Sequence, residues 1–65
     1  MLEQMIDEMR KLTYEISDLL DFAVYCIKNG DKELCDEILA LSDSKMAEQT
    51  DLSIKIALAR LEAQN

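Results

Sequence analysis

The chain can reverse direction sharply at only one place, because its 65 residues include a single glycine, Gly30, and no proline. A β-sandwich or barrel needs turn residues about every 8–12 positions, which this sequence cannot supply. Apolar residues make up 49% of the chain, too many for a disordered segment. The sequence therefore predicts an all-α fold.

The first helix is predicted over about residues 2–28, where apolar residues recur at alternating spacings of three and four. This heptad spacing is typical of helices that pack along a seam. The seam residues are Leu2, Met5, Met9, Leu12, Ile16, Leu19, Ala23 and Cys26. A second apolar row beside the seam comprises Ile6, Leu20 and Ile27. A stripe this wide indicates that the helix packs against more than one neighbour.

A turn is predicted at residues 29–31. Gly30 can adopt the left-handed conformation that closes a helix C-terminus, and Asp31 can cap the N-terminus of the next helix. So short a connection makes the second helix, predicted over about residues 32–63, antiparallel to the first.

The second helix is apolar on two sides. Its predicted inner face comprises Leu34, Ile38, Leu41, Leu52, Ile56 and Ala59, flanked by Cys35, Leu39 and Met46. The polar residues Ser42, Lys45 and Gln49 fall on or beside this face and dilute its middle. Beyond residue 52, Ile54, Leu58 and Leu61 form a second apolar set on the opposite side. A helix that is apolar on two sides needs partners on two sides.

A single hairpin over residues 1–65 has too small a core to be stable on its own account. We therefore expect a homo-oligomer, most simply a dimer in which two hairpins form a four-helix bundle. The predicted partner interface comprises Ile6, Leu20, Ile54, Leu58 and Leu61. The alternative is that the chain is a fragment that lacks its partner helix, and a different protein partner is also compatible with these faces.

Charge and composition exclude several functions. The formal net charge of -7 disfavours binding to nucleic acid and to anionic lipid surfaces. No apolar run approaches the length of a membrane span and no signal-peptide pattern opens the chain, so we expect a cytoplasmic protein without membrane insertion. Because the chain has no histidine, it cannot build a Ser-His-Asp or Cys-His arrangement, and we predict no enzyme, no catalytic residues and no cofactor.

Acidic residues offer the one alternative chemistry. Glu3 with Asp7 and Glu33 with Glu37 are spaced four apart, and a longer acidic ridge comprises Glu15, Asp18 and Asp21. Acidic residues at these spacings occur about as often as chance predicts. We therefore assign no metal ligands and interpret the acidic residues as solvated faces of the helices. A carboxylate metal-binding helical bundle remains the alternative function, and an acidic mimic of nucleic acid is a third.

Cys26 and Cys35 flank the turn and could lie near each other across the hairpin. They are either small buried hydrophobic residues or a redox-sensitive pair, and the sequence leaves this open.

The run Asn29-Gly30-Asp31-Lys32-Glu33-Leu34, followed by Ile38-Leu39 and Leu41, resembles the helical hairpin of PhoU-like proteins. The segment at residues 52–60 is similar to the second helix of archaeal members linked to potassium transport. The resemblance implies a regulatory, oligomer-forming adaptor for phosphate or ion transport. Some members bind iron clusters through Glu/Asp-x-x-x-Asp motifs, a form that Glu3 and Asp7 have here. We expect a non-enzymatic helical oligomerisation or interaction module, a regulatory PhoU-like protein or fragment.

Overall fold

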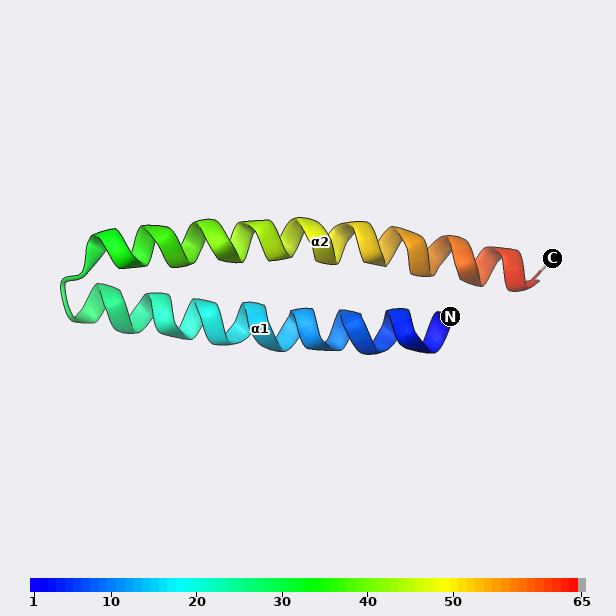
Figure 1. Cartoon of the computed structure of the whole chain (residues 1–65), viewed down its shortest axis with the longest axis horizontal. Coiled ribbons are helices and arrows are strands. Elements are labelled where there is room, and N and C mark those ends of the chain that lie inside the picture. The colour runs from blue at the N-terminus through cyan, green and yellow to red at the C-terminus, as the bar shows by residue number, and fades with distance from the viewer. Residues whose placement is uncertain (65) are drawn as a thin grey trace.

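The computed structural model describes residues 1–64 as two long helices that form one antiparallel hairpin (Figure 1). Helix α1 spans Leu2–Lys28 and helix α2 spans Lys32–Gln64. The hairpin measures 53 × 15 × 12 Å, and α2 extends beyond the N-terminus of α1 at the open end (Figure 1). The predicted all-α antiparallel hairpin is confirmed.

The turn is closed by backbone hydrogen bonds that only a left-handed residue allows. Gly30 has a φ of 76°, its N–H donates to the carbonyl of Ile27 at 3.1 Å, and the N–H of Asp31 donates to the carbonyl of Cys26 at 2.9 Å. These two bonds define a Schellman motif, which satisfies the last carbonyls of α1. The Asp31 Oδ1 atom accepts the backbone N–H of Leu34 at 3.2 Å, so this side chain caps α2. Both predicted roles in the turn are confirmed.

The α1 seam lies against α2 as predicted, with Ile16, Ala23 and Cys26 buried. The predicted inner face of α2 is wrong at Leu41, which is 48% exposed. The α2 seam instead runs through Cys35, Ile38, Ser42, Lys45, Gln49, Leu52, Ile56 and Ala59, all buried or half-buried. These residues keep the three-and-four spacing of the facing α1 seam. Geometry rather than hydropathy therefore decides which α2 residues face inward.

The middle of the seam is polar. Gln49 Nε2 donates to Thr13 Oγ1 at 2.7 Å, and Lys45 Nζ lies 2.7 Å from Glu15 Oε2. Ser42 is 0% exposed, and its Oγ atom has no hydrogen-bond partner. A buried hydroxyl without a partner loses its bonds to water and gains nothing in return.

Replacing Gly30 by alanine should lower the free energy of unfolding by about 1 kcal/mol, because an L side chain is strained at positive φ. No atom lies within 4 Å of the added Cβ, so the loss comes from the backbone alone. Gly30→Asn should cost less, since asparagine tolerates this conformation. Urea unfolding at one fixed protein concentration measures both, and equal stability of all three proteins would contradict the role of Gly30.

Ser42→Ala should raise the free energy of unfolding by about 1 kcal/mol, because it removes the unpaired hydroxyl and improves helix propensity. Ser44→Ala is the matched control, since Ser44 lies on the same helix but is exposed and reports propensity alone. A smaller gain at residue 42 than at residue 44 would show that the Ser42 hydroxyl is satisfied after all.

Candidate interaction surface

The two sides of the hairpin seam differ in chemistry. We call one the neutral side, because the row of residues that flanks the seam there is uncharged except at its two ends. It comprises Ile6, Thr13, Leu20 and Ile27 of α1 with Lys32, Leu39, Met46, Ser53 and Arg60 of α2. The opposite side, the charged side, comprises Glu8, Glu15 and Phe22 of α1 with Leu34, Leu41, Glu48 and Lys55 of α2. Each set follows from the heptad positions that flank the observed seam.

The neutral side exposes large apolar side chains along most of its length. Leu20, Leu39 and Met46 are 37–39% exposed, and Ile27 is 63% exposed. Ile6 is half-buried near the open end. A helix pair in water gains nothing from leaving such a row uncovered, and an extended apolar row of this kind is typical of an interaction site.

Three hollows follow the neutral side. One of about 410 Å³ at the turn is lined by Ile27, Gly30, Lys32, Cys35, Asp36 and Leu39. Two more lie toward the open end, share Met9 and Ser53, and measure about 280 and 330 Å³. The shared lining residues make these two hollows continuous. The neutral side is therefore grooved as well as apolar.

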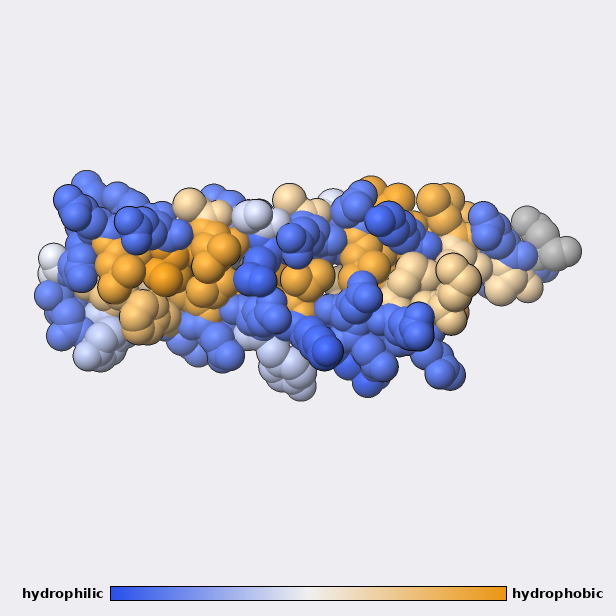
Figure 2. All heavy atoms as spheres, in the orientation of Figure 1, coloured by the Kyte–Doolittle hydropathy of each residue, from blue (hydrophilic) through white to orange (hydrophobic). Residues whose placement is uncertain are grey.

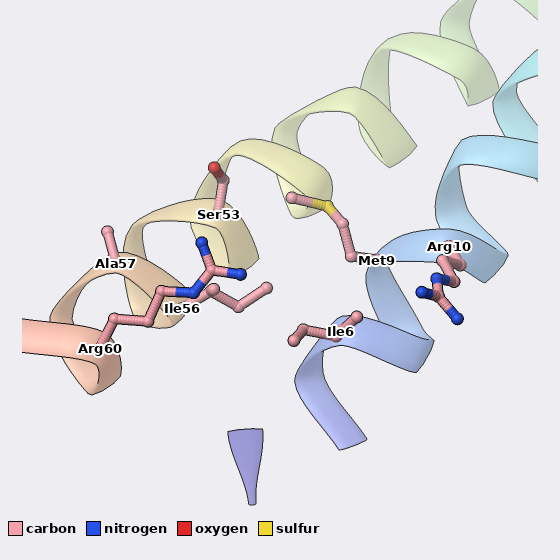
Figure 3. A pocket seen from close by; sticks show the side chains of 7 residues that line it. All are labelled: Ile6, Met9, Arg10, Ser53, Ile56, Ala57 and Arg60. Atoms are coloured by element: carbon pink, nitrogen blue, oxygen red, sulfur yellow. The ribbon is translucent and has the colours of Figure 1, made fainter. Parts of the chain in front are cut away.

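The hollow at the open end combines apolar walls with two cations (Figure 3). Ile6 of α1 and Ile56 of α2 point toward each other across the gap between the helices (Figure 3). In the view of Figure 3 the side chain of Arg60 extends in the direction of Ser53 and Ile56, whereas the side chain of Arg10 points away from α2. Both arginines of the chain thus lie at this end of the neutral side.

The charged side has shallow hollows whose walls are mostly ionic. The two hollows there are lined by Glu8, Lys11, Leu12, Glu15, Lys45, Glu48, Asp51, Leu52 and Lys55. The hydrogen bond to Glu15 raises the pKa of Lys45 above its ordinary value, although partial burial opposes this. On the face that Figure 2 shows, hydrophilic residues cross the boundary between the helices near the middle, and hydrophobic residues gather toward the turn.

The residues of the predicted interface do not form one surface. Ile6 and Leu20 lie on the neutral side. Ile54 is 55% exposed and lines the same hollow as Met9 at the open end. Leu58 and Leu61 are 54% and 58% exposed and belong to the outer face of α2. The structure thus brings Ile6 and Ile54 to the two adjoining hollows at the open end, places Leu20 farther along the neutral side, and leaves Leu58 and Leu61 outside these hollows.

Sequence reasoning missed four contributors to the neutral side: Leu39, Met46, Arg10 and Arg60. The hydropathy pattern places Leu39 and Met46 at the flanks of the inner face and gives no signal for the arginines. The correct α2 seam is the signal that identifies three of these residues, because Leu39, Met46 and Arg60 then fall in one row beside it.

Cys26 and Cys35 are free thiols, 2% and 3% exposed, that pack with Ala23 in the best-buried part of the hairpin. Burial raises the pKa of the Cys26 thiol, and the neighbouring Asp31 and Cys35 add to this effect. In this structure the two thiols act as small hydrophobic residues.

Within residues 1–64, no three Asp, Glu or Cys side chains converge into a group that could hold a metal ion. In the same range, neither helix has a stretch long and apolar enough to cross a membrane. Comparison of the chain with protein-family models, with curated proteins and with solved structures finds no match.

Native Cys26 and Cys35 should react with a thiol reagent such as dithionitrobenzoate at least about tenfold more slowly than the same thiols in urea, because they are buried and little thiolate forms. The rate of colour formation measures this directly. Equal rates in the native and unfolded protein would show that the turn end opens freely.

Proposed function

We propose that this chain is a non-enzymatic helical association module that pairs with a second copy through the neutral side to form a four-helix bundle. The observation that carries the proposal is the contrast between the two sides of the seam. One side has a flanking row that is uncharged between Lys32 at the turn and Arg60 at the open end, and the other side has hollows lined mostly by acids and lysines.

The surface area of the hairpin supports pairing. The chain exposes 5164 Å², whereas a compact monomer of 7.4 kDa exposes about 4200 Å². The surplus of about 1000 Å² is close to the ~800 Å² that each partner buries in a stable complex. A side 53 Å long and 12–15 Å wide offers a footprint of similar size.

A second copy fits the neutral side better than an unrelated partner of opposite charge would. A strongly basic partner would bind where the acids are, on the charged side and the outer faces. The uncharged middle of the neutral side instead matches another uncharged row, and the same row of a second copy is such a surface.

A regulatory role follows from the resemblance to PhoU-like proteins and remains a prediction. In such a role the paired hairpins would present Leu58 and Leu61, which stay exposed on the outer face of α2, to a transport protein or its regulator. Loss of binding to a candidate partner on changing Leu58 and Leu61 to lysine, with pairing intact, would test this role.

Leu20→Glu should weaken pairing by about 30-fold or more, because each copy would bury an unpaired charge in the interface. Leu41→Glu is the matched control, since residue 41 lies opposite residue 20 but on the charged side, where it is 48% exposed. Sedimentation equilibrium should give a two-chain mass for the unmodified chain and for Leu41→Glu, and a one-chain mass for Leu20→Glu. Circular dichroism should show the same helicity in all three.

Two results would overturn the proposal. One is a one-chain mass for the unmodified protein at about 100 µM, where even weak complexes form. The other is stronger dissociation by Leu41→Glu than by Leu20→Glu, which would place the interface on the charged side.

A further inference from the structure

Cys26 of α1 and Cys35 of α2 lie opposite each other in the seam of the hairpin. Cys26 precedes Gly30 by four residues, and Cys35 follows it by five. In an antiparallel hairpin, residues equally far from the turn lie level with each other, because both helices rise by about 1.5 Å per residue. The bond between Glu15 and Lys45, which are also equally far from Gly30, shows that this rule holds in the middle of the hairpin. The two cysteines are therefore level across the seam.

Both cysteines belong to the same buried cluster. Cys26 and Cys35 are 2% and 3% exposed and pack with Ala23. Their backbones are tied to one residue of the turn. The N–H of Asp31 donates to the carbonyl of Cys26 at 2.9 Å, and the carbonyl of Asp31 accepts the N–H of Cys35 at 3.1 Å. The turn thus holds the two cysteines in defined positions with both side chains inside the hairpin.

Helix packing brings such residues within reach of a disulfide bond. The axes of packed helices lie about 8–10 Å apart, depending on the size of the side chains between them, and Cα atoms lie about 2.3 Å from their axis. The Cα atoms of two residues that face each other squarely are then about 3.5–5.5 Å apart. A disulfide requires a Cα separation of about 4.4–6.8 Å. Two level seam cysteines satisfy this requirement.

We infer that Cys26 and Cys35 form a redox pair, in which oxidation joins the two helices by a disulfide bond beside the turn and stabilises the folded hairpin. They are the two cysteines of the sequence, so no other pairing within one chain competes. The inference concerns a single chain and goes beyond the proposed association.

The oxidant is a low-molecular-weight disulfide such as oxidised glutathione. Cys35 lines the hollow at the turn, so a reagent that enters this hollow meets Cys35 first. The Cys35 thiolate attacks one sulfur of the reagent, the S–S bond of the reagent breaks, and one half leaves as a thiol. The Cys26 thiolate then attacks the Cys35 sulfur, and the second half leaves. The protein loses two electrons and two protons, and the reagent gains both.

Burial mainly slows this exchange. A reagent reaches the thiols when the turn end opens, and the raised pKa of the Cys26 thiol lowers the fraction of thiolate. The equilibrium depends instead on how the folded and unfolded chains differ. A fold that holds two thiols side by side favours the disulfide, and the disulfide favours that fold by the same factor.

A redox titration of the folded and the unfolded chain tests the pair. The unmodified chain is equilibrated with increasing oxidised glutathione at one fixed concentration of reduced glutathione, in buffer and in urea. Free thiols are then alkylated, and mass spectrometry measures the fraction with a disulfide. Half oxidation should need at least about tenfold less oxidised glutathione in buffer than in urea. Circular dichroism should show a helical chain in buffer in both redox forms.

Tryptic peptides identify the bond that forms. Trypsin cleaves after Lys28 and Lys32, which lie between the two cysteines. A disulfide within one chain should therefore link the peptides 12–28 and 33–45 and lower the mass of a single chain by about 2 Da.

A displaced cysteine provides the matched control. In the variant Cys26→Ala/Val24→Cys the two cysteines have a similar separation in sequence, but residue 24 is 51% exposed and lies two positions from the seam, on the outer side of α1. In urea this pair should oxidise about as readily as the native pair, because the two loops are similar in length. In buffer it should need more oxidised glutathione than in urea, since the hairpin holds its thiols on different faces.

Several results would overturn the redox pair. One is half oxidation of the unmodified chain at equal or lower oxidised glutathione in urea than in buffer. Others are a helical control variant that oxidises in buffer as readily as the native pair, a disulfide that links two chains, and loss of helicity on oxidation. None of these results bears on pairing through the neutral side, which sedimentation measures separately with both thiols reduced.

Discussion

Two helices can cover only one side of each other, and the rest of this structure depends on that constraint. The hairpin buries a narrow seam, and its best-buried cluster consists of small side chains, Ala23, Cys26 and Cys35. Larger residues such as Ile27 and Leu39 stay exposed beside the seam. Part of the apolar surface thus stays in water within one hairpin, and the association that we propose would bury it and add to the stability of the fold.

The polar residues in the middle of the seam lower the stability of the hairpin, but they fix how its two helices are aligned. Thr13 with Gln49 and Glu15 with Lys45 are the cross-helix pairs that the hairpin forms there. A sliding shift of one helix along the other would separate both pairs, whereas an entirely apolar seam would tolerate several shifts. The turn fixes one end of the hairpin and these pairs fix its middle. The positions of all surface residues along the hairpin axis are therefore well defined. The interface that we propose with a second copy requires such defined positions.

The sequence was sufficient for the fold because its strongest signals are local. The heptad spacing from Leu2 to Cys26 and the capping residues Gly30 and Asp31 act within one helix or one turn. The α2 face was harder to predict, since Leu41 is apolar and exposed while Lys45 is polar and faces inward. Hydropathy gives the wrong ranking there, and only the spacing imposed by the facing helix gives the right one. Two residues of the neutral side, Ile6 and Leu20, were therefore identified from the sequence and its arginines were missed, and the assignment of this side as an interface stays a prediction.

The distribution of charge limits how far association can proceed. Most of the acids responsible for the net charge of -7 lie on the charged side and on the outer faces, such as Asp7, Glu15 and Asp21. An interface related by a two-fold axis uses the same surface on both copies and closes after two. In the pair that we propose, further copies would have to approach acidic faces, where like charges repel. The acidic residues outside the neutral side would thus oppose open-ended assembly, and this is why we propose a closed pair rather than a larger assembly.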